Sequence, residues 1–206
     1  MDILKLQKEL RKRYLLPHTW HYKYDAYLDA KSNFIYSNYN FDEIIEKTEK
    51  LSEDLRQYAI NRWYNYWCDK GLYLIFTNHE IVTPNYNHYN EIETITIQEI
   101  NFKIRSQVYP NQFARTLRYA LLHKEELLYW LYRRIRKSNL HPLNNHIFVV
   151  FYQRDGDHWK LKAELYWLRN IIFNYLDHFD LQKVVRLNIQ DNITNYADII
   201  WCVKLG

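Results

Sequence analysis

Apolar residues recur every three to four positions in three long stretches of the chain, which is the spacing of one face of an α-helix. These stretches predict helices over about 42–76, 112–137 and 158–179. Ser52 offers a second helix start inside the first stretch, because serine is a favoured residue at a helix N-terminus. A shorter amphipathic helix is predicted over residues 2–14.

Runs rich in β-branched or aromatic residues predict strands between these helices. Residues 91–97 and 100–108 are two such runs with a two-residue joint, and together they predict a β-hairpin. Residues 146–152 are continuously apolar, which is typical of a central strand covered on both faces. Two further strands are predicted over about 184–189 and 198–203.

Two segments lack a regular period. Residues 18–40 are rich in Tyr, His and Asn, and we expect them to be irregular or to form short strands. Residues 77–90 are polar, and Thr83-Pro84-Asn85 predicts a turn. The predicted order is therefore helix, hairpin, helix, buried strand, helix and two strands. Because the chain crosses from a hairpin through a helix to a buried strand, we expect an α/β fold with a mixed central sheet and helices on both faces.

The length and composition of the chain fit a single folded unit. A chain of 206 residues with 48% hydrophobic residues can bury a sizeable core, so we expect one domain. Within it, residues 1–41 precede a core formed by residues 42–206. The N-terminus lacks the apolar segment of a signal peptide, and no stretch approaches the roughly 20 apolar residues that span a bilayer. We therefore expect a cytoplasmic protein with no membrane partner.

The composition also argues against several kinds of active site and allows several kinds of binding surface. Only 3 Gly residues argue against Gly-rich phosphate loops and against the Gly-x-Ser-x-Gly elbow of serine hydrolases. Cys68 and Cys202 share no metal-type spacing, which argues against a zinc module. A net charge of +4 is compatible with binding to DNA. The 20 Tyr and 7 Trp residues suit base stacking, a protein partner or a homodimer interface equally well.

The second strand of the predicted hairpin is basic on one face. Alternation puts Lys103 and Arg105 on one face and Phe102 and Ile104 on the other. If the following helix packs beside the hairpin, its cations extend a phosphate-binding face. The candidate nucleic-acid-binding residues are Lys103, Arg105, Arg115, Arg118, Arg133 and Arg134. Alternatively, the basic cluster at 133–137 only complements the helix dipole and its side chains face water.

Four phrases of the sequence carry a family resemblance: RWYNYW at 62–67, INFKIRSQVYPNQF at 100–113, HWKLKAEL at 158–165 and ADIIW at 197–201. Together with the order of the elements, they resemble a little-characterised bacterial and phage family of the PD-(D/E)xK nuclease superfamily, over about residues 50–204. The resemblance implies a restriction-endonuclease-like fold in which the hairpin carries the active site. In that superfamily two acids hold a divalent metal, and a Lys two residues after the second acid orients the attacking water.

The place of that acid-x-Lys motif falls on Lys103-Ile104-Arg105. Lys103 is a cation and cannot be a metal ligand, so the resemblance does not extend to a standard metal site. Arg105 could stand in for the Lys, although an arginine cannot act as a base at neutral pH. An active nuclease would therefore need Mg²⁺ held by acids elsewhere, of which the candidates are Glu91, Glu93 and Glu53. In that arrangement Glu91 and Glu93 are the metal ligands.

Three hypotheses stay open at this point. In the first, a nuclease-like protein without catalytic activity and without a cofactor binds DNA or a protein partner through the basic hairpin face. In the second, the chain is a divergent Mg²⁺-dependent DNA endonuclease whose acids have migrated. In the third, a structural or inhibitory protein uses its aromatic surface as an interface. Lys103 separates the first two, because a cation there favours binding and a carboxylate would favour cleavage.

Overall fold

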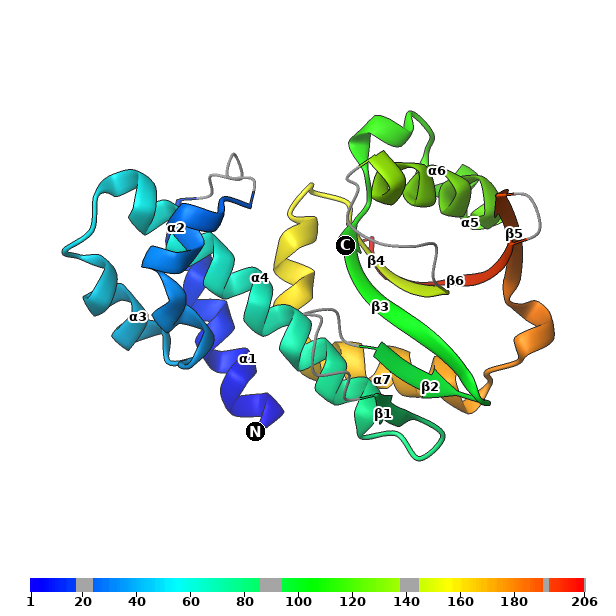
Figure 1. Cartoon of the computed structure of the whole chain (residues 1–206), viewed down its shortest axis with the longest axis horizontal. Coiled ribbons are helices and arrows are strands. Elements are labelled where there is room, and N and C mark those ends of the chain that lie inside the picture. Colours follow the sequence, from blue (N-terminus) through cyan, green and yellow to red (C-terminus); the bar gives the residue numbers. More distant parts are fainter. Residues whose placement is uncertain (18–23, 86–93, 138–144, 191–192, 206) are drawn as a thin grey trace.

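One mixed sheet of six strands organises the molecule (Figure 1). The computed structural model describes residues 1–17, 24–85, 94–137, 145–190 and 193–205. The strand order is β1-β2-β3-β4-β6-β5. The strands are β1 Thr83–Asn85, β2 Thr94–Ile97, β3 Ile100–Val108, β4 His146–Gln153, β5 Val185–Gln190 and β6 Ile193–Lys204. β4 is parallel to β3 and to β6, and the other neighbours are antiparallel, so the predicted α/β class with a mixed sheet is confirmed.

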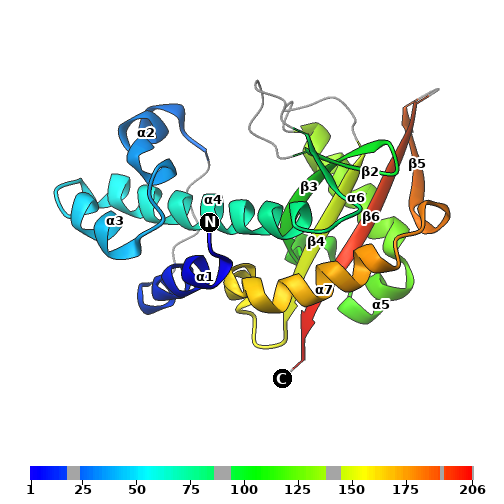
Figure 2. The same cartoon turned by 90° about the horizontal axis from the view of Figure 1, so that it is seen from below.

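Helices cover both faces of this sheet (Figure 2). The α-helices are α1 Ile3–Lys12, α2 Ala26–Lys31, α3 Phe41–Thr48, α4 Glu53–Thr77, α5 Leu117–Leu122, α6 Lys124–Lys137 and α7 Leu165–Asp177. Consecutive residues of β4 alternate between two apolar clusters: Ile147 and Val149 pack with α4 and α7, whereas Phe148 and Val150 pack with α6. β4 is therefore the strand buried on both faces that its apolar run predicts.

The two helix layers meet at one buried carboxylate. Asp198 of β6 accepts hydrogen bonds from Lys124 Nζ of α6 at 2.9 Å and from the Tyr175 hydroxyl of α7 at 3.0 Å. It also accepts from the backbone N–H of Ile199 at 2.8 Å. These bonds satisfy the carboxylate, and Asp198 thereby links α6 and α7 through the sheet.

The N-terminal helices pack beside the first half of α4 (Figure 1). The indole N–H of Trp63 donates to the Asn38 carbonyl at 3.0 Å, and that of Trp67 donates to the Ile35 carbonyl at 2.8 Å. The prediction of irregular structure over 18–40 is wrong for the described part, residues 24–40, which contains α2 and a 3₁₀ turn at Asn33–Tyr36. The Asp25 carboxylate accepts from the two N–H groups at the start of α2, and this cap stabilises a helix with a weak apolar period.

Two of the predicted long helices are divided. The stretch over 42–76 forms α3 and α4, and Ser52 occupies the N-cap of α4 with an extended backbone, although its side chain makes no capping hydrogen bond. The stretch over 112–137 becomes helical only at Leu117, after a left-handed backbone at Ala114 with φ 54°, and it is divided at His123, whose φ of −127° and ψ of 53° are not helical. Thr116 then caps α5 through the Tyr119 N–H at 3.2 Å, and α6 starts separately at Lys124.

The C-terminal helix prediction over 158–179 is also shortened, since residues His158–Ala163 form a 3₁₀ helix before α7 begins at Leu165. α4 contains 25 residues and is therefore about 37 Å long at 1.5 Å per residue. None of the helices in the described ranges is long and apolar enough to cross a membrane.

The predicted hairpin is present as β2 and β3, joined by Gln98 and Glu99. Both joint residues have positive φ, 47° and 65°, as a two-residue type I′ turn requires. The first residues of the predicted strand, 91–93, lie outside the described residues. Thr83-Pro84-Asn85 is not a turn but the edge strand β1, where a proline is tolerated because one side of the strand needs no ladder hydrogen bond.

Candidate nucleic-acid interface

The half of the sheet formed by β1, β2 and β3 is apolar on one face and polar on the other. Ile95, Ile97 and Phe102 are buried with α4 and α7. The apolar cluster under α6 takes its strand residues from β4, β5 and β6, so among the described elements α6 does not bury the other face of the hairpin. That face, which we call the open face, consists of Thr94, Thr96, Asn101, Lys103 and Arg105.

Cross-strand neighbours order this polar surface. Lys103 lies opposite Thr94, and Asn101 lies opposite Thr96. The Thr96 hydroxyl donates to Asn101 Oδ1 at 2.7 Å, and Asn85 Nδ2 of β1 donates to the same oxygen at 3.3 Å. These side-chain hydrogen bonds therefore link three strands across the open face.

Lys103 and Arg105 form a half-buried pair of cations. Burial lowers the pKa of Lys103, and the neighbouring Arg105 charge lowers it further. Burial also lowers the pKa of Arg105, while the charge of Asp69 and the Tyr132 hydroxyl act in the opposite direction. The Nε atom of Arg105 is buried and has no hydrogen-bond partner within the described ranges.

Neither cation forms an ion pair with an acid among the residues that the structure describes, although the charge of Asp69 acts on Arg105. Among the described residues, the ion pairs of the protein do not include Lys103 or Arg105. Like charges side by side repel one another, and an anion placed between them would relieve this repulsion. Arg105 offers the planar donor geometry that suits a phosphate, and Lys103 adds a point charge. The pair therefore has the properties of an anion-binding site.

Strand β4 and helix α6 support this pair from the adjacent part of the sheet. His146 lies opposite Lys103 in the parallel register and is 1% exposed. Its Nδ1 atom lies 3.2 Å from the hydroxyl of Tyr132 on α6, and burial raises the pKa of Tyr132, which keeps that hydroxyl neutral. Asn145 Nδ2 donates to the Asn101 carbonyl at 3.0 Å, while its Oδ1 accepts from the Tyr196 N–H at 2.8 Å. Asn145 thereby ties β3 to β6 at the start of β4.

An acid that the sequence analysis did not single out lies behind β3. Ser106 points to the α4 side and donates its hydroxyl proton to Asp69 Oδ1 at 2.5 Å. Asp69 is exposed, and its charge opposes the lowering of the Arg105 pKa. The available signal was that Asp69 and Lys70 are the only charges between positions 63 and 76 of a helix.

The predicted acids do not gather at Arg105 in the described chain. Glu53 is the first residue of α4 and accepts a hydrogen bond from Gln57 Nε2 at 2.7 Å. It precedes Asp69 by 16 positions, which places it about 24 Å away along the helix. Glu91 and Glu93 lie outside the described residues. Within the described ranges there is no group of three His, Cys, Asp or Glu residues that could hold a metal ion.

The predicted cations beyond the hairpin fall into two groups. Arg134 Nη1 donates to Gln112 Oε1 at 2.8 Å and the guanidinium lies 4.9 Å from the ring centre of Trp130, so Arg134 sits near the end of β3. Arg115 is close to the same end, because its carbonyl accepts from the Tyr109 hydroxyl at 2.8 Å. Tyr109 is four residues beyond Arg105, about 13 Å along the strand. The remaining two, Arg118 on α5 and Arg133 on α6, are exposed.

No protein-family model, no curated protein and no solved structure matches this chain. What the open face can bind is therefore inferred from its own residues and from no relative.

Proposed function

We propose that the protein binds DNA through the open face, as a nuclease-type scaffold in which cations replace the metal-binding acid. The observation that carries this proposal is the half-buried pair Lys103 and Arg105, which has no ion-pair partner in the described chain. The order of helix, hairpin, crossover helix, buried strand and helix supports the scaffold, since it is the order of the PD-(D/E)xK core.

Because Lys103 and Arg105 are partly buried, we expect them to bind a phosphate more strongly than a cluster of surface lysines would. Charges that are partly removed from water are screened less by salt, so each contact with a phosphate oxygen is stronger than at an exposed site. Thr96 and Asn101, on the same face, supply neutral hydrogen-bonding groups of the kind that contact sugars and phosphates. Arg115 and Arg134, at the far end of β3, extend the positive surface along the strand.

The binding test is an anisotropy titration of a fluorescent DNA duplex at several salt concentrations. We expect Lys103→Glu with Arg105→Glu to weaken binding by at least about tenfold for each lost charged hydrogen bond. The slope of log affinity against log salt should fall in magnitude by roughly 1.8, about 0.9 for each phosphate contact. The matched control is Arg154→Glu with Lys183→Glu, two exposed cations off the open face, and this variant should retain the affinity of the parent within a few-fold.

Two results would overturn the proposal. Absent or salt-insensitive binding of the parent protein would exclude DNA as the ligand and would favour a protein partner. Cutting of a plasmid in the presence of Mg²⁺ or Mn²⁺ would contradict a purely binding role if the cutting disappeared in Glu91→Ala, Glu93→Ala or Asp69→Ala. We expect the plasmid to stay intact.

A further inference from the structure

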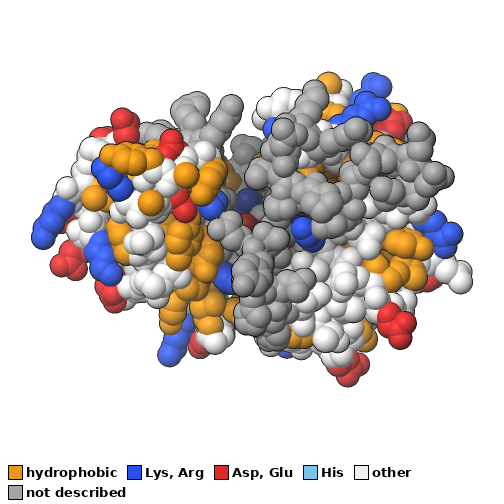
Figure 3. Space-filling model, in the orientation of Figure 1, with side chains coloured by type: hydrophobic (Ala, Val, Ile, Leu, Met, Phe, Trp, Pro, Cys, Tyr) orange, Lys and Arg blue, Asp and Glu red, His pale blue; other side chains and the backbone are white. Residues whose placement is uncertain are grey.

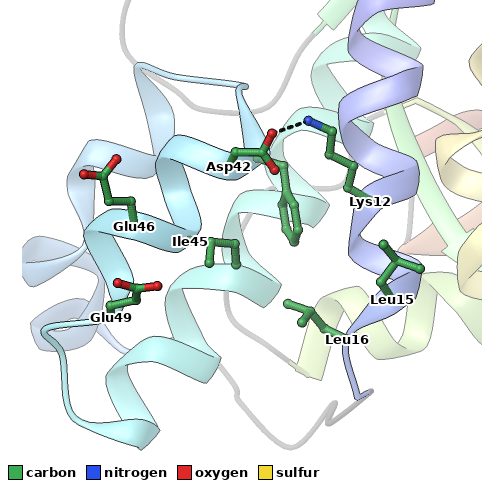
Figure 4. Close-up of a pocket in the computed structure, with 8 residues that line it drawn as sticks. Lys12, Leu15, Leu16, Asp42, Ile45, Glu46 and Glu49 are labelled. Carbon is green, nitrogen blue, oxygen red and sulfur yellow. Dashed lines mark hydrogen bonds and ion pairs between the residues drawn. The ribbon is translucent and has the colours of Figure 1, made fainter.

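An apolar groove with charged edges lies between α1 and α3, far along the chain from the hairpin (Figure 4). Its volume is about 340 Å³. Leu15 and Leu16, which follow α1, face Ile45 of α3 across the groove, and the ion pair between Lys12 Nζ and Asp42 Oδ2, at 2.6 Å, links the two sides (Figure 4). The groove is therefore built by two elements that are tied together and do not close over it.

The α1 side of the groove is apolar and basic. Leu15, which lines the groove, is 84% exposed, and Leu4, nearer the start of α1 and outside the groove lining, is 52% exposed. Of the α1 lysines only Lys12 lines the groove; Lys5 and Lys8 precede it by seven and four positions, so they continue its basic strip along the same side of the helix. Within the described chain, Lys5 and Lys8 have no ion-pair partner.

The α3 side is acidic. Glu46 and Glu49 line the groove, are exposed and form no ion pair in the part of the chain that the structure describes. The local charge is opposite to the net charge of +4 of the whole chain. Figure 3 shows hydrophobic side chains gathered over these N-terminal helices with basic and acidic side chains around them. The groove thus separates a basic strip from an acidic strip.

We infer that this groove is a self-association surface, in which α1 of a second copy lies along α3 and α3 of that copy lies along α1. A two-fold axis brings the same patch of both subunits together, so a patch with one basic and one acidic side pairs each side with its opposite. Leu15 of each copy would then cover the apolar floor of the other copy's groove. The chain itself supplies the complementary element, which is why a second copy fits better than an unrelated partner.

The self-association surface lies on the N-terminal helices, away from the open face on β2 and β3 (Figure 1). The inference therefore does not depend on DNA binding, and the two can fail separately.

The first test measures the mass of the full chain by sedimentation at concentrations up to about 100 µM, where a pair with a micromolar dissociation constant is mostly dimeric. We expect a dimer, and we expect Leu15→Glu to raise its dissociation constant at least about tenfold, because a leucine that the dimer would bury is replaced by a charge. Leu122→Glu is the matched control, since Leu122 is 75% exposed on α5 and lies outside the groove. It should leave the dimer unchanged, and circular dichroism should show that both variants fold.

A charge exchange gives the sharper test, because misfolding cannot imitate it. Glu46→Lys with Glu49→Lys makes both sides of the groove basic, and Lys5→Glu with Lys8→Glu makes both sides acidic. Each variant alone should be monomeric, and an equimolar mixture should form heterodimers. A parent protein that stays monomeric throughout the concentration range would overturn the inference. So would a dimer that is insensitive to all three variants, or a mixture that fails to associate.

Discussion

The two faces of the β2–β3 hairpin differ in what they provide, although they are built from alternating residues of the same strands. Phe102 is 0% exposed in the core with α4 and α7, whereas its neighbour Lys103 lies on the open face beside a second cation. The apolar face holds the hairpin in the fold through its packing. The open face can therefore keep two neighbouring cations, although their mutual repulsion and partial burial are unfavourable. Residues that stabilise the fold and residues proposed to bind DNA are therefore separated by one position along a strand.

The largest expected difference between the faces is the response to truncation. Phe102→Ala removes a fully buried ring and should lower the free energy of unfolding by about 3–5 kcal/mol. Lys103→Ala, one position later, removes no core contact and no ion-pair partner in the described chain, so it should change this free energy by less than about 1 kcal/mol. Urea denaturation of both variants measures the difference. Equal losses would contradict the division of roles between the two faces.

The pH dependence of stability should have opposite signs on the two sides of the sheet. Burial raises the pKa of Tyr175, which donates to Asp198. In the unfolded chain this tyrosine loses its proton near pH 10, so above that pH the folded state binds more protons and stability falls by about 1.4 kcal/mol per pH unit. Lys103 has a lowered pKa, so between that pKa and the unfolded value of about 10.4 the unfolded state binds more protons and stability rises with pH.

Urea unfolding at several pH values between about 8 and 11 separates these contributions. Tyr175→Phe should reduce the loss of stability above pH 10, and Lys103→Met should remove the rise below it. If either variant kept the parental pH profile, the assigned burial of that group would be wrong. Because each variant is compared with the parent, the other tyrosines and lysines cancel.

We expect Arg105 to lower the stability of the fold and, at the same time, to contribute to DNA binding. Its buried Nε has no hydrogen-bond partner in the described chain, so Arg105→Met should raise the free energy of unfolding by about 1 kcal/mol. The same variant should weaken DNA binding by about tenfold. Arg105→Lys is the control that keeps the charge, and it should retain more of the affinity. A loss of stability in Arg105→Met would show that the guanidinium supports the fold.

A similarly small effect on stability is expected at the turn that joins the two strands. Gln98 and Glu99 adopt left-handed backbone angles that L-residues with a side chain disfavour. Gln98→Asn with Glu99→Gly supplies the preferred residues of a type I′ turn and should stabilise the protein by about 1 kcal/mol. Glu99→Ala removes the same charge without the glycine, so thermal unfolding of the two variants distinguishes backbone strain from electrostatics.

The pattern of apolar and polar residues predicts an element correctly when the element's own residues determine which of its faces is buried. β4 follows from its apolar run, and the alternation in β3 correctly separates Phe102 from Lys103. β1 could not be predicted in this way, because Pro84 signals a turn and the strand exists only through its pairing with β2. β6 begins at Ile193, before the predicted start at 198, since its first residues are ordered by pairing with β5 and not by an apolar pattern.

The candidate site was predictable where it depends on a single strand and not where it depends on two elements. Lys103 and Arg105 share a face by alternation alone. Asp69 was missed, because its contact with Ser106 depends on which turn of α4 passes behind β3. Glu53 is a candidate only through the family resemblance, and α4 is long enough to place this first residue far from the hairpin.

Helix α4 extends from the bundle formed with α1 and α3 to the back of β3. It is one continuous helix of 25 residues. Its length therefore sets the distance between the surface proposed for self-association and the face proposed for DNA. In a two-fold pair, two such helices would fix the separation and the relative phase of two DNA contacts. The spacing of paired half-sites along a duplex would then be encoded in the length of one helix.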